Sequence, residues 1–69
     1  MLYADLNAAE NLHFFARLYG VESARVGELL ETVWLAGLGR QPVRSFSRGM
    51  QQRLALARAL LHRPQVLLL

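Results

Sequence analysis

The strongest structural signal is a run of helix-favouring residues in the second half of the chain. The run reads Phe46-Ser47-Arg48-Gly49-Met50-Gln51-Gln52-Arg53-Leu54-Ala55-Leu56-Ala57-Arg58-Ala59-Leu60. Its Leu, Ala, Arg and Gln residues predict a helix from Arg48 to His62, which Pro64 ends. Ser47 is placed to cap the first turn, where free backbone N–H groups and the helix dipole favour an anion.

Two shorter helices are predicted before this one. Asn7 and Glu10 have the spacing of a capping box, and Gly20 is a typical helix stop, so the first helix is expected over Ala8 to Tyr19. Ser23 is expected to cap a second helix over Ala24 to Ala36. Residues at helical spacing predict one apolar face on each of the three helices.

Each predicted helix has its own set of apolar residues. The first helix contributes Ala8, Leu12, Phe15 and Tyr19; the second contributes Val26, Leu29, Leu30, Val33 and Gly37; the third contributes Met50, Leu54, Ala57 and Leu61, with Leu56 and Leu60 on a second side. Trp34 is predicted at the partly buried edge of the second face, or against a partner subunit. The third helix, with two apolar sides, is expected to remain partly exposed beside only two short helices.

The chain ends in a continuous apolar run, residues 66–69. Such a run is consistent with a buried strand of a parallel sheet. The predicted fold class is therefore mostly α. We expect a three-helix subdomain over residues 1–63 and the start of one core β-strand over residues 65–69.

Composition limits the chain to one small domain of 69 residues. Hydrophobic residues make up 54% of it, more than so small a core can bury, which indicates surface meant for a neighbour. The absence of cysteine excludes disulfides and thiolate metal sites, and His13 and His62 have no metal-ligand spacing. No apolar run reaches membrane-spanning length and the N-terminus lacks a signal-peptide layout, so a cytosolic location is expected.

Charge is unevenly distributed along the chain. All five acidic residues lie in the first 31 positions, and six arginines follow without an acid. A basic half favours an anionic partner such as phosphate or nucleic acid, unless acidic residues elsewhere neutralise it. Arg48, Arg53, Arg58 and Arg63 are five apart and rotate by about 140° each around a helix, so they form no continuous basic stripe. That pattern argues against a helix lying in a nucleic-acid groove.

The run that begins at Phe46 resembles the signature motif of ABC transporter ATPases, Leu-Ser-Gly-Gly-Gln followed by Arg and an Ala-Arg-Ala-Leu tail. Ser47, Gly49, Arg53 and residues 57–60 match this pattern, whereas Phe46, Arg48 and Met50 depart from it. The resemblance implies that the chain is part of the helical subdomain of an ATP-binding subunit. It also implies that the C-terminal apolar run begins the Walker B strand, and that Arg53 and Arg58 are mainly structural.

The resemblance further implies an ATP site made of Ser47, Arg48, Gly49 and Met50, on the γ-phosphate side of ATP held by the opposite subunit. Ser47 and Gly49 would contact the phosphate, and Ser47→Arg is expected to abolish ATPase activity in the intact protein without unfolding it. Arg48 replaces a Gly and either adds charge near the phosphates or points outward. Met50 replaces a Gln, so a polar contact on that side chain is lost.

The 69 residues lack the groups that complete such a site. They contain no lysine, hence no Walker A loop, and no acid follows the C-terminal run, hence no Walker B carboxylate to hold Mg²⁺. We therefore expect this stretch to be inactive alone, with the ATP and Mg²⁺ ligands supplied by the full-length protein.

Residues 5–20 resemble the segment that follows the Q-loop in ABC exporters, most like the haem exporter ATPase of cytochrome c biogenesis. ATPases of drug, sodium or polysaccharide exporters are the alternatives within the family. The resemblance implies a dimer with a second ATP-binding subunit, a membrane-spanning permease contacted near Met1 to Leu6, no nucleic acid, and a peripheral place on the cytoplasmic face of the inner membrane.

Two alternative functions, outside the ATPase class, remain open. The acid-free second half is compatible with a stand-alone basic helical module that binds nucleic acid, for which a salt-dependent DNA titration is the test. The excess of apolar surface is compatible with a small helical protein–protein adaptor, for which partner binding that is insensitive to ATP is the test.

Overall fold

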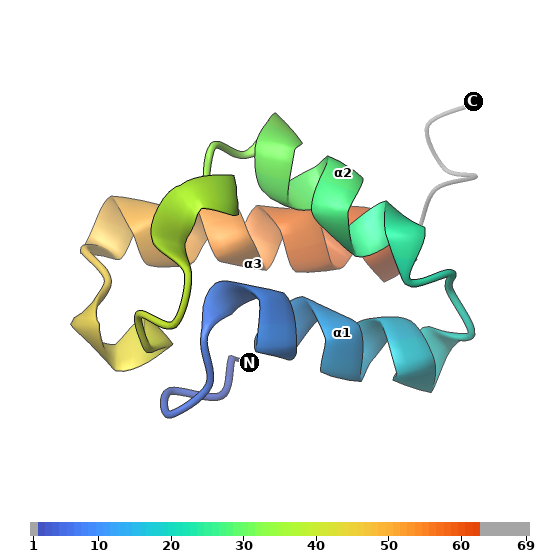
Figure 1. The fold of residues 1–69 in the computed structure, drawn as a ribbon, viewed down its shortest axis with the longest axis horizontal. Coiled ribbons are helices and arrows are strands. Elements are labelled where there is room, and N and C mark those ends of the chain that lie inside the picture. The colour runs from blue at the N-terminus through green and yellow to red at the C-terminus, as the bar shows by residue number, and fades with distance from the viewer. Residues whose placement is uncertain (1, 63–69) are drawn as a thin grey trace.

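The computed structural model describes residues 2–62, which form three α-helices and two short 3₁₀ turns. The helices are α1 (Ala8–Tyr19), α2 (Ala24–Thr32) and α3 (Arg48–His62), and the 3₁₀ turns are Ala36–Leu38 and Val43–Ser45. Both α1 and α2 pack along α3, the longest element (Figure 1). The mostly helical fold class and the predicted bounds of α1 and α3 are confirmed. The strand expected over residues 65–69 lies outside the described residues.

Helix α1 has the predicted signals at both ends. The Asn7 side chain accepts a hydrogen bond from the Glu10 backbone N–H at 2.8 Å, and the Glu10 carboxylate accepts one from the Asn7 N–H at 2.9 Å. Gly20 then ends the helix at φ 71°, a left-handed conformation that glycine adopts without strain. The N–H of Val21 donates back to the Ala16 carbonyl, as in a Schellman motif.

Helix α2 ends at Thr32, so the prediction that it reaches Ala36 is wrong. It closes in the same motif as α1: the Trp34 N–H donates to the Glu31 carbonyl at 3.1 Å, and the Leu35 N–H donates to the Leu30 carbonyl at 2.8 Å. This closure brings Leu35 and Leu30 together in the core, where both are buried. The burial of Leu35 therefore decides where the helix stops.

Trp34 occupies the position in α2 that Gly20 occupies in α1. Its φ is +63°, and its side chain is 82% exposed. The prediction of a partly buried edge residue is therefore wrong, because the left-handed turn directs the indole away from the core. Gly37, predicted on the buried side of α2, lies exposed in the following 3₁₀ turn.

Ser23 does not cap α2, contrary to the sequence prediction. Its backbone is helical at φ −58° and ψ −35°, whereas a capping residue is usually extended, and its side chain makes no capping hydrogen bond. Its hydroxyl oxygen lies 3.4 Å from Nδ1 of His13 instead.

The core lies where the three helices meet. Leu12 of α1 and Leu54 of α3 are fully buried, and Val26 of α2 is 1% exposed. The Arg58 guanidinium lies over the Phe15 ring, 4.7 Å from its centroid, which supports a structural role for Arg58. The apolar faces predicted for α1 and α3 are buried as expected, with Tyr19 and Met50 at their half-buried edges.

Several large apolar side chains lie outside this core, as the composition predicts. They are Tyr3, Phe14, Leu18, Trp34 and Leu56. Leu56, on the second apolar side of α3, is 54% exposed. Within residues 2–62, no helix is both long enough and apolar enough to cross a bilayer.

Candidate anion-binding site at the start of α3

The chain reaches α3 through a rigid turn. Val43–Ser45 forms a 3₁₀ turn, and Phe46 follows it in an extended conformation at φ −74° and ψ 147°. Val43 and Phe46 are buried, so both ends of the turn are held by the core. The Gln51 side-chain amide donates to the carbonyls of Val43 and Phe46, at 3.5 and 3.4 Å. The direction in which the backbone enters α3 is thus fixed.

Ser47 caps α3, as predicted. Its hydroxyl oxygen accepts the Met50 N–H at 3.1 Å, and its carbonyl accepts the Gln51 N–H at 3.0 Å. The hydroxyl hydrogen is still able to donate, because the bond to Met50 uses only a lone pair. The N–H groups of Arg48 and Gly49 have no acceptor within the helix. Three donors are therefore available at one exposed end.

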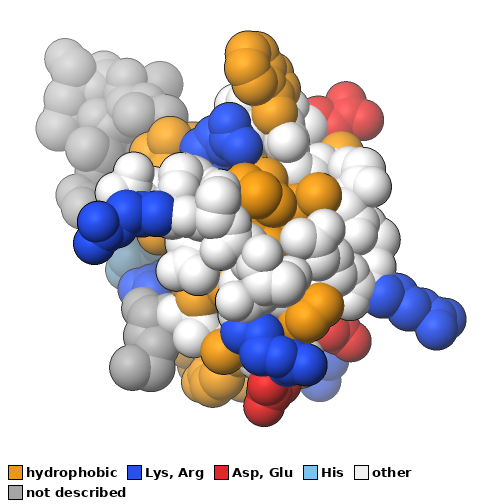
Figure 2. All heavy atoms as spheres, turned by 90° about the vertical axis from the view of Figure 1, so that its left-hand side faces the viewer, with side chains coloured by type: hydrophobic (Ala, Val, Ile, Leu, Met, Phe, Trp, Pro, Cys, Tyr) orange, Lys and Arg blue, Asp and Glu red, His pale blue; other side chains and the backbone are white. Residues whose placement is uncertain are grey.

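The positive end of the α3 dipole has no acid in the first turn to compensate it. That turn carries Arg48, whereas the first turn of α1 carries Glu10, whose carboxylate takes part in the capping box. Arginine side chains lie at several points around this end of the molecule (Figure 2). A negative charge at the start of α3 is therefore favoured both by the dipole and by the nearby guanidinium.

Gly49 leaves open space beside these donors. A Cβ built at this glycine meets no atom within 4 Å, so the packing of these helices does not require a glycine here. Because glycine has no side chain, an atom from outside can approach its backbone more closely than the backbone of any other residue type. The start of α3 is therefore open to an approaching anion.

The four predicted site residues do not all face the same way. Ser47, Arg48 and Gly49 are exposed at the start of α3, whereas the Met50 side chain is half-buried and packs against the core. Arg48 lines a surface hollow of about 440 Å³ together with Gln51 and Gln52. The Met50 backbone N–H thus bonds to the Ser47 cap, while the Met50 side chain packs against the core.

Sequence reasoning missed two polar residues that build this region. Asn11 is fully buried and bonds to the turn before α1, and Gln51 braces the turn before α3. A signal for Asn11 was present, because positions 8, 11, 12 and 15 have the spacing of one helix face. Gln51 had no such signal, since its partners are carbonyls of an irregular turn. Among residues 2–62, no group of three acidic, histidine or cysteine side chains is placed to hold a metal.

Comparison with known proteins decides the family. A family model described as ABC transporter matches residues 1–69, the whole chain. The chain belongs to the ABC transporter ATP-binding family. The stretch that resembles the ABC signature motif is therefore the capped, acid-free start of α3.

Relatives of this ABC family chain include transporters of different kinds. It is 39% identical over 71 residues to the ABC transporter ATP-binding protein NatA of Bacillus subtilis, covering 97% of this chain and 29% of that protein. It is 46% identical over 68 residues to the bacitracin transport ATP-binding protein BcrA of Bacillus licheniformis, covering 97% and 22%. It is 44% identical over 72 residues to the Fe(3+) ions import ATP-binding protein FbpC of Streptomyces coelicolor, covering 99% and 21%. The chain spans less than a third of the length of each.

Proposed function

We propose that this chain is the signature-bearing part of the ATP-binding subunit of an ABC transporter. In this proposal, Ser47 and the backbone N–H groups of Arg48 and Gly49 bind the γ-phosphate of ATP held by a second ATP-binding subunit. The observation that carries it is the acid-free, serine-capped start of α3, with open space beside Gly49. The family membership of the whole chain supports the same assignment.

The rest of the site would come from other parts of the protein. The 69 residues contain no lysine for a Walker A loop, so the Mg²⁺ and the main nucleotide contacts would be supplied by parts of the full-length protein outside these residues. Arg48 would add a positive charge beside the phosphates, since it lies in the exposed first turn of α3. In this arrangement, ATP joins two subunits, and hydrolysis releases them.

Ser47 provides the test. Ser47→Asp keeps a capping oxygen for the Met50 N–H, so α3 is expected to form, but it places a carboxylate where the γ-phosphate would bind. We expect Ser47→Asp and Ser47→Arg to lower the ATPase kcat of the full-length protein at least 100-fold, with an unchanged circular dichroism spectrum. Ser23→Asp is the matched control, because Ser23 is exposed and caps no helix. Wild-type turnover in both Ser47 variants would refute the site.

We also propose that a membrane-spanning permease contacts the segment before α1 and the adjoining face of α1, which would place the protein on the cytoplasmic face of the inner membrane. A hollow of about 620 Å³ lies on this face, lined by Leu6, Glu10, His13, Phe14, Arg17 and Leu18. Phe14 and Leu18 are 44% and 66% exposed, and acidic Glu10 and basic Arg17 flank them. An amphipathic segment of a permease fits an apolar hollow of this kind.

These 69 residues contain no cysteine, so in a full-length protein from which any other cysteine has been removed, one introduced cysteine marks one position. We expect Ala4→Cys or Leu18→Cys to cross-link to the permease in membranes through a short thiol-reactive linker. Gly27→Cys serves as the control, because it is exposed on α2 with open space around it. Equal cross-linking from all three positions would count against this contact.

The transported substrate is a separate proposal. We propose haem export for cytochrome c biogenesis, on the resemblance of residues 5–20. The names of these relatives include bacitracin transport and Fe(3+) import, so similarity alone selects no substrate. Deleting the gene should remove covalently bound haem from c-type cytochromes, as read on a haem-stained gel. Normal cytochromes together with new sensitivity to a peptide antibiotic would favour a drug exporter.

A further inference from the structure

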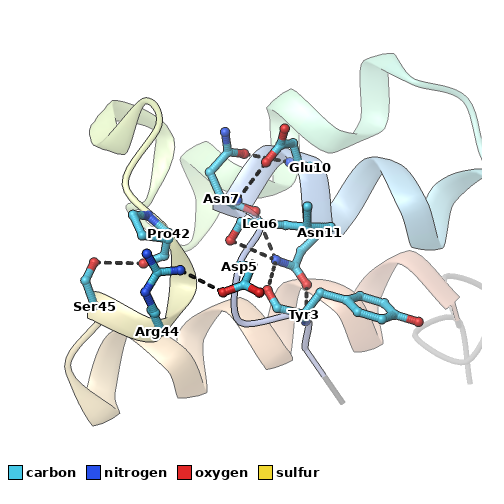
Figure 3. Close-up of polar contacts among 9 residues, drawn as sticks. All are labelled: Tyr3, Asp5, Leu6, Asn7, Glu10, Asn11, Pro42, Arg44 and Ser45. Atoms are coloured by element: carbon cyan, nitrogen blue, oxygen red, sulfur yellow. Dashed lines mark hydrogen bonds and ion pairs between the residues drawn. The ribbon is translucent and has the colours of Figure 1, made fainter.

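The most completely bonded polar side chain among residues 2–62 is Asn11, on the inner face of α1. It is 0% exposed, and it is the one polar side chain of the core in this part of the chain. Its Oδ1 accepts the Tyr3 N–H at 2.6 Å, and its Nδ2 donates to the carbonyls of Tyr3, Leu6 and Asn7, at 3.0, 3.4 and 3.0 Å. All of these bonds go to backbone of residues 3–7, which precede α1 (Figure 3).

The same backbone holds the turn that leads to Ser47. The Leu6 carbonyl accepts the Val43 N–H and the Ala4 carbonyl accepts the Arg44 N–H, both at 2.9 Å. The Arg44 guanidinium also donates to the Asp5 carboxylate at 2.7 Å, although both side chains are exposed. The Leu6 carbonyl is thus shared between Asn11 and Val43, and it joins two segments that are far apart in sequence.

From Val43 the connection to the phosphate site is short and stiff. The turn Val43–Ser45 closes with the Phe46 N–H donating to the Val43 carbonyl at 2.9 Å, and the Ser45 hydroxyl donates to the Pro42 carbonyl at 2.7 Å. Phe46 is buried, and Ser47 follows it directly. A shift of residues 3–6 would therefore be transmitted to the Ser47 cap.

We propose that Asn11 is a positioning residue for the signature site. By fixing residues 3–6, it sets the position of the 43–46 turn and hence of the Ser47 hydroxyl. The inference rests on the proposed function of Ser47. It also extends that proposal. Residues 3–6, which are proposed to contact the permease, would help to hold the phosphate site in position. Asn11 itself does not touch the nucleotide.

The test is a double-mutant cycle in the full-length protein, with ATPase turnover as the readout. Asn11→Ala is expected to lower kcat about tenfold, because a misplacement of well under an ångström at a phosphate contact has effects of that order. The affinity of the isolated subunit for a fluorescent ATP analogue should stay within about twofold. In the Ser47→Ala background, Asn11→Ala should cause a clearly smaller loss, since the hydroxyl it positions is gone and only the backbone N–H groups of Arg48 and Gly49 remain.

Asn7→Ala is the matched control, because it removes an asparagine side chain from the same helix start while leaving the Leu6 carbonyl bonded. Its kcat should stay within about twofold of wild type. Asn11→Ser, which keeps one donor, replaces Asn11→Ala if the alanine variant does not fold.

Each result decides the proposal. An equal loss in both backgrounds, an unchanged kcat in Asn11→Ala, or failure of both Asn11 variants to fold would overturn it and leave Asn11 a folding residue. If Ser47→Ala alone leaves turnover at the wild-type value, the proposed function fails. If Ser47→Ala lowers turnover and the Asn11 variants do not, only this inference fails.

Discussion

Trp34 has a backbone conformation that is unfavourable for a residue with a side chain. It lies at φ +63°, where an L-residue other than glycine is strained by about 1–2 kcal/mol. Its indole is 82% exposed and recovers little of that cost by burial. The strain persists because the turn at Trp34 brings Leu35 into the core.

We therefore expect Trp34→Gly to stabilise the protein. Glycine removes the strain but adds freedom to the unfolded chain, so the net gain in the free energy of unfolding is about 1 kcal/mol. The measurement is the midpoint of urea denaturation of the full-length protein. Trp34→Ala separates the two contributions, because alanine removes the indole and keeps the strained backbone. An equal gain in the alanine variant would show that the indole, and not the backbone, is the destabilising part.

At the scale of the helix, the two predicted caps Asn7 and Ser23 differ in structure. Asn7 forms a full capping box with Glu10, whereas Ser23 makes no capping hydrogen bond. The difference arises because Ser23 is already in a helical conformation and its hydroxyl lies near His13. Of Asn7 and Ser23, therefore, only Asn7 stabilises its helix by capping it.

Asn7→Ala is accordingly expected to lower the free energy of unfolding by about 1 kcal/mol, the usual cost of a lost N-cap. Ser23→Ala should change it by less than about 0.5 kcal/mol, as for most exposed substitutions. Thermal unfolding of both variants, followed by circular dichroism, is the measurement. A larger effect at Ser23 would contradict the structure of the α1–α2 connection.

For the molecule as a whole, α3 contributes side chains both to the core and to the exposed apolar surface. Leu54 is fully buried between α1 and α2, while Leu56, two residues later, is 54% exposed. Leu54→Ala is expected to lower the free energy of unfolding by about 2–5 kcal/mol, because it leaves a cavity. Leu56→Ala, the matched control, should cost less than about 1 kcal/mol if nothing else covers it. Urea denaturation measures both, and a similar cost at Leu56 would indicate a neighbour on that side of α3.

The sequence predicted the features that depend on local rules. The bounds of α1 and α3, the Asn7 and Ser47 caps and the Gly20 stop all follow from side chains that bond within one turn or from backbone freedom. The end of α2 did not follow, because it depends on whether Leu35 or Trp34 enters the core, and only the packed structure decides that. Gln51 was missed because its partners belong to an irregular turn rather than to a helix or strand.

Within these 69 residues Trp34 is the sole tryptophan, and its indole is nearly fully hydrated. Its fluorescence emission should therefore resemble that of the free amino acid in water. Any partner or neighbouring part of the protein that covers the turn after α2 would shift this emission to shorter wavelengths. In a full-length variant in which any other tryptophan is replaced, the strained turn thus provides an intrinsic optical probe, and mixing experiments follow assembly on this side of the molecule without an added dye.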